Sequence, residues 1–151
     1  MAQPIIPNGK YAITHHNGQG PRLTLQDHAE DAIVTIVSPT EDPAQQEWEV
    51  ELKSDSDITI KSVKYGTYLS YSDTPYANEI VTGQKEPREW QLRPTSEALI
   101  FDIIVPGGPV DGNELALDLS LLKIFPPRAA LRPWKSSGLD QGWYFKAIHN
   151  E

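Results

Sequence analysis

The sequence of 151 residues contains no cysteine, which excludes disulfide bonds, thiolate catalysis and cysteine-ligated metal sites. Positive charge is scarce, because 13 basic residues face 21 acidic ones and the formal net charge is −8. A surface of that sign repels a phosphate backbone, so we expect no nucleic-acid partner. No apolar run approaches the roughly 18–20 residues that span a membrane, so we expect no membrane partner either.

We also expect neither a secretory signal nor long helical segments. Residues 1–10 (MAQPIIPNGK) contain neither a basic region nor a long apolar core, so we expect a cytoplasmic location. Proline and glycine, 13 and 10 residues respectively, leave no uninterrupted helical stretch. Segment 114–122 (ELALDLSLL) alternates apolar and polar residues, which is typical of a strand. The sequence therefore predicts an all-β protein of short strands separated by turns.

Three segments share one pattern, which is a polar residue, a spacer, a tryptophan and then alternating apolar positions. They are 46–52, 88–93 and 141–148. Each follows three other strand-like segments, which gives twelve expected strands in three groups of four. These preceding segments are 9–13, 22–25 and 33–37 in the first group, 58–61, 67–71 and 79–81 in the second, and 99–103, 114–117 and 122–125 in the third.

Twelve short strands in a threefold repeat that close on a shared core form a β-trefoil. Barrel closure also removes the exposed strand edges that a soluble β protein must otherwise protect. We expect one β-trefoil domain over residues 1–151, with repeats at approximately 9–52, 53–95 and 96–151. The three tryptophans of the repeats are expected to fill equivalent core positions. They are Trp48, Trp90 and Trp143.

The Q-x-W pattern, kept at Gln46–Trp48 and Gln141–Trp143 and altered at Arg88–Trp90, resembles that of ricin B-type lectins. The whole chain is similar in organisation to mushroom β-trefoil protease inhibitors, notably at 86–94 (EPREWQLRP) and 123–127 (KIFPP). This resemblance implies a fungal, monomeric protein without a cofactor. It would inhibit a serine protease, as mycospins do, through an exposed loop on a rigid scaffold. The implied partner is the protease itself.

A trypsin-like protease accepts one Lys or Arg side chain in an acidic pocket, so its inhibitor must present that residue on a pre-formed loop. Residues 119–139 contain four basic residues and no acidic one, and 126–138 is expected to be the longest stretch without a strand. We expect Arg128 to enter the protease pocket, with the small Ala129 after it. Lys135 is the next candidate, and Arg132 ranks behind it because a proline follows.

Other loops carry secondary candidates for contact with a protease. Arg22 and Lys64 lie in or beside expected turns. The loop with Asp27 and His28 contains no Lys or Arg, so as a reactive loop it would select a protease with a different pocket. Inhibition of a cysteine protease, as by mycocypins, is an alternative in which glycine-rich loops such as 17–20 enter the cleft.

A carbohydrate-binding lectin is the alternative from another functional class. Ricin-type sites combine an aspartate early in a repeat with an aromatic platform, and Asp27, Asp73 and Asp118 are expected at similar places in the three repeats. Only the second repeat offers a platform, because Tyr71 and Tyr76 flank its aspartate. Each aspartate also fits a plain turn residue that accepts a bond from its own backbone.

Enzyme signatures do not emerge from the sequence. None of its serines lies in a Gly-x-Ser-x-Gly elbow, which nucleophilic hydrolases of the α/β class require. His15 and His16 are adjacent in an expected strand, so their side chains point to opposite faces and cannot share a metal ion. We therefore expect neither an enzyme nor a metal site.

Overall fold

The computed structural model describes residues 6–15, 20–29, 31–38, 41–54, 56–95, 99–110, 112–122, 124, 126–134 and 142–148. Within these ranges the regular elements are thirteen β-strands and one 3-10 helix. No helix in the described ranges is long and apolar enough to cross a membrane. The predicted all-β class is confirmed.

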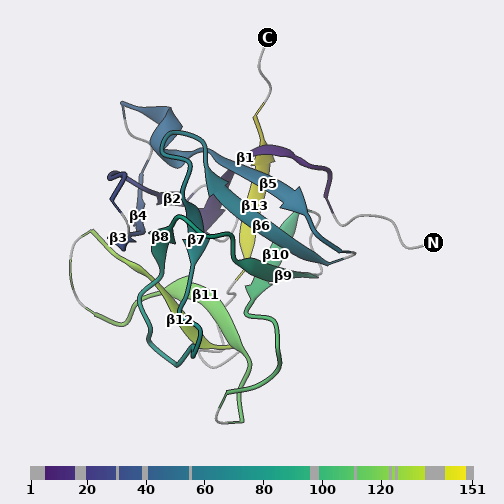
Figure 1. Ribbon diagram of the computed structural model, residues 1–151. Coiled ribbons are helices and arrows are strands. Elements are labelled where there is room, and N and C mark those ends of the chain that lie inside the picture. The colour runs from purple at the N-terminus through teal and green to yellow at the C-terminus, as the bar shows by residue number, and fades with distance from the viewer. Residues whose placement is uncertain are drawn as a thin grey trace.

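The strands are short and follow one another around the molecule (Figure 1). They are β1 (Gly9–His15), β2 (Arg22–Thr24), β3 (Ala32–Ile33), β4 (Thr35–Val37), β5 (Trp48–Leu52), β6 (Asp57–Ser62), β7 (Tyr68–Ser70), β8 (Thr82–Gln84), β9 (Glu89–Pro94), β10 (Ile100–Ile104), β11 (Leu115–Leu119), β12 (Ala129–Pro133) and β13 (Trp143–Ala147). The 3-10 helix η1 (Pro43–Gln46) precedes β5.

Six of the strands close into an antiparallel barrel. In order around it, β1 pairs with β5, β5 with β6, β6 with β9, β9 with β10, β10 with β13, and β13 with β1. Six of the remaining seven strands form three hairpins, β2–β4, β7–β8 and β11–β12, and the short β3 pairs with β8. A six-stranded barrel with three hairpins is the β-trefoil that the threefold sequence pattern predicts, and closure leaves no free barrel edge.

The three hairpins are joined to one another by a ring of backbone hydrogen bonds. The Val34 N–H donates to the Val81 carbonyl (3.1 Å), the Val81 N–H to the Ala129 carbonyl (2.9 Å), and the Ala129 N–H to the Val34 carbonyl (2.9 Å). All three residues are fully buried. Because every donor has its acceptor on the next hairpin, the ring places the hairpins around a pseudo-threefold axis.

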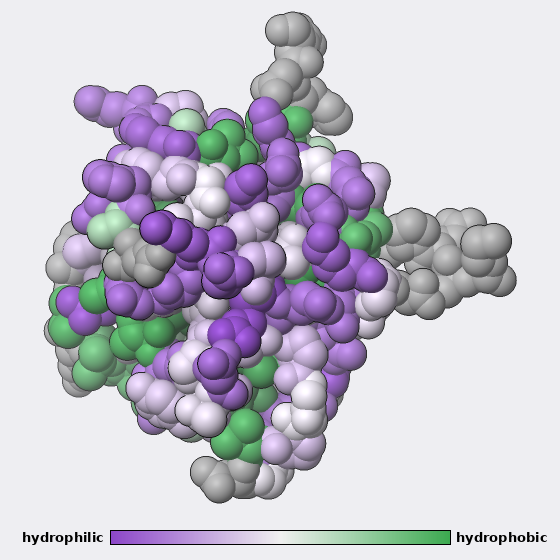
Figure 2. Space-filling view, in the orientation of Figure 1, coloured by the Kyte–Doolittle hydropathy of each residue, from purple (hydrophilic) through white to green (hydrophobic). Residues whose placement is uncertain are grey.

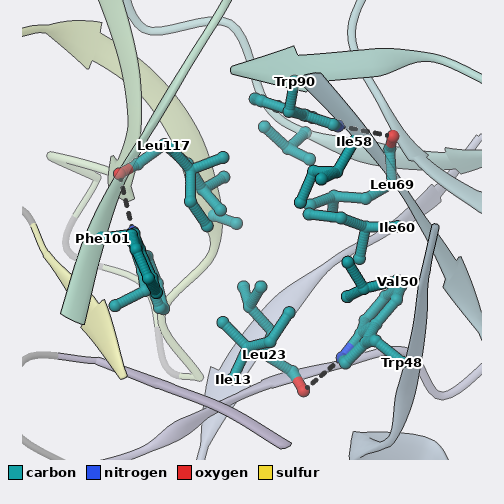
Figure 3. Packing of buried hydrophobic residues seen from close by; sticks show 14 of the residues in the cluster. Ile13, Leu23, Trp48, Val50, Ile58, Ile60, Leu69, Trp90, Phe101 and Leu117 are labelled. Atoms are coloured by element: carbon teal, nitrogen blue, oxygen red, sulfur yellow. Dashed lines mark hydrogen bonds between the residues drawn. The ribbon is translucent and has the colours of Figure 1, made fainter. Parts of the chain in front are cut away.

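The three repeat tryptophans are fully buried and make equivalent contacts. The indole N–H of Trp48 donates to the Leu23 carbonyl (3.1 Å), and that of Trp90 to the Leu69 carbonyl (2.9 Å) (Figure 3). Trp143 makes the same bond to a carbonyl of β11, that of Leu117 (3.0 Å). The predicted equivalence of the tryptophans is confirmed. Each indole bond links a barrel strand to the first strand of a hairpin.

The strand predicted at 122–125 is wrong, because the third hairpin uses β12 instead. Leu117 of β11 lies opposite Leu131 of β12, and the apolar side chains of β12 enter the core. Leu121 and Leu122 remain exposed, at 66% and 53%. The apolar residues of this segment suggested a strand, but these two leucines do not pack into the core. The predicted strand-free stretch 126–138 is likewise wrong, since β12 lies within it.

Two more strand boundaries differ from the prediction for one shared reason. The segment expected at 33–37 is divided into β3 and β4 at Val34. The segment expected at 79–81 lies just before β8 rather than in it. In both places the backbone bonds to a neighbouring hairpin: Val34 and Val81 belong to the ring, and the Leu131 N–H donates to the Glu79 carbonyl (2.8 Å).

We expect Trp48→Phe, Trp90→Phe and Trp143→Phe each to lower the free energy of unfolding substantially. Each change leaves a buried carbonyl without its donor, which costs about 1–3 kcal/mol, and the smaller ring leaves a cavity that adds to the loss. Urea denaturation followed by circular dichroism measures the change.

Trp134→Phe is the matched control for these three variants. The indole N–H of Trp134 donates to the half-exposed Asp102 carboxylate (3.0 Å), so water can replace that bond. Equal losses of stability for the control and the three core variants would contradict the role given to the repeat tryptophans.

Candidate functional site

A pocket with a volume of about 1000 Å³ opens beside β7 and β8 in the second repeat. Figure 2 shows that the face of the molecule over these strands is largely hydrophilic. The lining residues supply carboxylates, amides, hydroxyls, two cations and aromatic rings. They are Asp31, Tyr76, Thr82 and residues 70–73, 78–80 and 84–88.

One wall of the pocket is built on Arg88. Its Nη2 donates to Asp73 Oδ1 (2.8 Å), and its Nε lies 3.5 Å from Ser70 Oγ. The guanidinium carbon is 5.0 Å from the centre of the Tyr71 ring, which is cation–π distance. The Arg88 guanidinium is therefore held through two of its nitrogens, Nη2 and Nε.

Tyr71 is a structural part of this wall. Its ring meets Trp90 at 81° with 4.8 Å between ring centres, and its hydroxyl donates to the Glu89 carbonyl (2.7 Å). Burial raises the pKa of Tyr71 to about 12, and the nearby Arg88 charge opposes that rise. With the Arg88 guanidinium over its ring, Tyr71 is not the open aromatic platform that the sequence suggested.

Tyr76 and Asp73 both line the pocket, and both are exposed. The Tyr76 residue is 56% exposed, and the Asp73 side chain is 92% exposed. The predicted combination of an aspartate with an aromatic ring is present here, with Tyr76 as the available ring. An exposed carboxylate accepts hydroxyl donors, and an exposed phenol ring covers an apolar ligand face.

Side-chain contacts of Glu79 and Asn78 shape the loop between β7 and β8. The Glu79 carboxylate accepts bonds from the Ser72 N–H (2.6 Å) and the Ser72 hydroxyl (3.0 Å). Asn78 has a φ of +73°, a conformation that asparagine tolerates better than most residues. Its side-chain oxygen accepts a bond from Arg132 Nη1 (2.6 Å). Arg132, proposed from the sequence as a protease contact, thus supports a pocket-lining residue from the third hairpin.

The structure does not place Arg128 and Ala129, the main candidates for protease binding, on the exposed loop that was expected. Arg128 is half-buried and forms an isolated bridge with Thr35. Ala129 is fully buried at the start of β12. The expectation that both lie on an exposed, strand-free loop is wrong, because the backbone here completes the inter-hairpin ring. Lys135 lies outside the described residues.

The secondary candidates are scattered over the first and second repeats. Arg22 is half-buried in β2, and Lys64 is exposed in the turn after β6, where it forms an ion pair with Asp42. That pair lowers the pKa of the Asp42 carboxyl. Asp27 accepts a bond from the Ala29 N–H (3.1 Å) and lies 3.6 Å from the exposed His28. The structure brings none of these residues into the pocket.

The tryptophan bonds also correct the alignment of the three aspartates. Leu23, Leu69 and Leu117 are equivalent acceptors, so counting four residues onward matches Asp27 with Asp73 but reaches a leucine in the third repeat. Asp118 lies within β11 and bonds the Leu119 N–H (2.7 Å). The expected likeness of Asp118 to the other two is wrong.

Sequence reasoning missed Arg88 and Glu79 as pocket residues. A signal for Arg88 existed, since it replaces the glutamine of the second Q-x-W pattern. No local signal marks Glu79, whose burial depends on how the loop folds back. Among the residues that the structure describes, no group of three or more His, Asp or Glu side chains is arranged to hold a metal ion.

The fold and the pocket together define a β-trefoil with a polar site on its second hairpin. No protein-family profile matches the sequence, and no curated protein sequence matches it. Solved structures do share the fold. The Rhizoctonia solani agglutinin is 18% identical with a TM-score of 0.78, over 95% of this chain and 97% of that one.

Two other similar structures are a lectin and a designed protein. The Macrolepiota procera ricin B-like lectin, solved in complex with lactose, is 24% identical with a TM-score of 0.72, over 95% of this chain and 99% of that one. The designed threefold-symmetric protein ThreeFoil is 15% identical with a TM-score of 0.77, over 93% and 99%. At these identities the likeness shows the β-trefoil fold.

The raised pKa of Tyr71 makes a prediction about stability at high pH. In the unfolded chain a tyrosine ionises near pH 10, whereas Tyr71 in the folded protein ionises at about 12. The unfolded state therefore releases this proton first, and the stabilisation is lost as the pH rises from about 10 to about 12. Urea midpoints across this interval should fall less steeply for Tyr71→Phe than for the parent protein, and identical slopes would contradict the assignment.

Proposed function

We propose that this protein binds carbohydrate in the pocket of its second repeat. The observation that carries the proposal is the presence of the exposed Asp73 carboxylate and the exposed Tyr76 ring in one polar pocket. A saccharide offers hydroxyls that donate to a carboxylate, and it also offers an apolar C–H face that packs against an aromatic ring.

The pocket is suited to a hydroxyl-rich ligand because its polar groups are held in place before binding. Asp73 is bonded to Arg88, and Glu79 fixes the loop that carries Tyr76 by accepting two bonds from Ser72. Asn78 is anchored from the third hairpin by Arg132. Groups that are already ordered lose less conformational entropy when a ligand binds.

The similar structures support the lectin class over protease inhibition. One is a lectin complexed with lactose, and another is the Polyporus squamosus lectin bound to a sialylated glycan, at 16% identity and a TM-score of 0.73 over 98% of this chain and 51% of that one. Inhibition of a serine protease through Arg128, Lys135 or Arg132 stays a prediction from the sequence. An assay of the same protein sample against trypsin tests it.

We expect the protein to bind at least one member of an array of neutral and acidic oligosaccharides that includes lactose. Tyr76→Ala and Asp73→Asn should each weaken binding by about tenfold or more. Asp73→Asn removes a charged acceptor, whose bond contributes about 1.5–3 kcal/mol, and Tyr76→Ala removes the ring that packs against the apolar sugar face; each 1.4 kcal/mol is tenfold in affinity. Isothermal titration calorimetry with the strongest array ligand measures the effect.

Asp27→Asn is the matched control for Asp73→Asn, since Asp27 holds the equivalent position in the first repeat and lies outside the pocket. It should leave the affinity unchanged. A parent protein that binds no saccharide on the array, or binding that survives both pocket variants, would overturn the proposal.

A further inference from the structure

The second repeat departs from the first at the residue two positions before the tryptophan. In the first repeat this residue is Gln46, which is 1% exposed. Its Nε2 donates to Thr24 Oγ1 (3.1 Å) and to the carbonyls of Val37 (3.3 Å) and Ser38 (3.0 Å). Gln46 therefore donates to the backbone at the end of its own hairpin.

Arg88 holds the same position but reaches further. Its Nε lies by Ser70, the counterpart of Thr24 one residue after the tryptophan-bonded leucine, and its guanidinium then continues to Asp73. The side chain is too long to end in the hairpin as glutamine does. At this position the first repeat has a glutamine that bonds its own hairpin, whereas the second repeat has an arginine that places a cation in the pocket wall.

The Arg88–Asp73 pair presents both donors and acceptors to the pocket. Arginine carries five N–H donors in a planar fork, and a carboxylate has acceptor sites on two oxygens. The bond between Arg88 Nη2 and Asp73 Oδ1 engages one of each. Two adjacent hydroxyls on a sugar ring match such a pair, because one hydroxyl donates to the carboxylate while the other accepts from the guanidinium.

The charge of the whole pocket decides which saccharides fit this pair. Four carboxylates line it, from Asp31, Asp73, Glu79 and Glu86, against the two cations of Lys85 and Arg88. A ligand with a carboxylate or sulfate group would meet more negative than positive charge. An uncharged diol avoids that repulsion and leaves the ion pair intact.

We propose that Arg88 is a specificity-determining residue that, together with Asp73, selects uncharged saccharides presenting two adjacent hydroxyls. This inference rests on the proposed carbohydrate-binding function. Arg88 acts both by donating to a ligand hydroxyl and by holding the exposed Asp73 carboxylate in one orientation.

Calorimetric titration with lactose and with its sialylated form tests the proposal, since the two probes differ by one acidic sugar. If the array identifies another neutral ligand, that ligand and its acidic derivative are the probes. The parent protein should bind the neutral probe at least tenfold more tightly than the acidic one. Arg88→Gln, which introduces the first-repeat residue, should weaken neutral binding at least tenfold.

Arg88→Lys should recover only part of the lost affinity, because an ammonium group keeps the charge but not the planar fork. Arg22→Gln removes an arginine outside the pocket and should change neither affinity. A double-mutant cycle of Arg88→Gln with Asp73→Asn should give losses that do not multiply, since each variant breaks the same pair. Thermal unfolding by circular dichroism identifies any variant that fails to fold, in which case Arg88→Lys and the cycle built on it replace Arg88→Gln.

The outcomes separate this inference from the proposed function. Failure of the parent protein to bind any saccharide overturns the proposed function, and this inference with it. Binding that Arg88→Gln and Arg88→Lys leave unchanged, or a parent preference for the acidic probe, overturns the role of Arg88 alone.

Discussion

The ring of backbone hydrogen bonds between Val34, Val81 and Ala129 is the constraint on which the rest of the structure depends. Each of these buried residues gives its N–H to one neighbouring hairpin and its carbonyl to the other, so no hairpin satisfies its own backbone alone. A buried N–H or carbonyl without a partner is costly, and all three hairpins must therefore be in place together. The ring also explains why the chain divides into β3 and β4 at Val34 and why β8 begins directly after Val81.

The three tryptophans connect the hairpins to the barrel. Each indole N–H is bonded to the first strand of a hairpin, while its ring fills the barrel core. These bonds set the register of the repeats, and the residue two positions earlier can then vary without loss of the fold. Gln46 uses its position to bond the hairpin backbone. Arg88 uses the same position to enter a pocket.

The site follows from this difference between repeats that share one scaffold. The first repeat has an exposed aspartate, Asp27, whose bond is to its own turn. The third has the exposed Leu121 at the matching position. Only the second repeat combines an aspartate, an arginine and an exposed tyrosine in the described pocket. A symmetric fold thereby carries different side chains in its repeats, because its loops can change while the tryptophans and the ring keep the scaffold.

The sequence by itself determined the all-β class, the threefold pattern and the equivalent burial of Trp48, Trp90 and Trp143, because alternation and repeat spacing are local properties of the chain. Under the lectin alternative, it also predicted that an aromatic platform beside an aspartate would lie in the second repeat, at Tyr71, Asp73 and Tyr76. Only the tertiary structure decided that 129–133 and not 122–125 forms the last hairpin strand, that Arg88 covers Tyr71, and that Glu79 is buried under the loop. The choice of 129–133 depends on backbone hydrogen bonds between hairpins that are far apart in the chain, such as that of Ala129 with Val34. The other two outcomes depend on how Arg88 and the loop between β7 and β8 fold against the second hairpin, which strand alternation and repeat spacing do not encode.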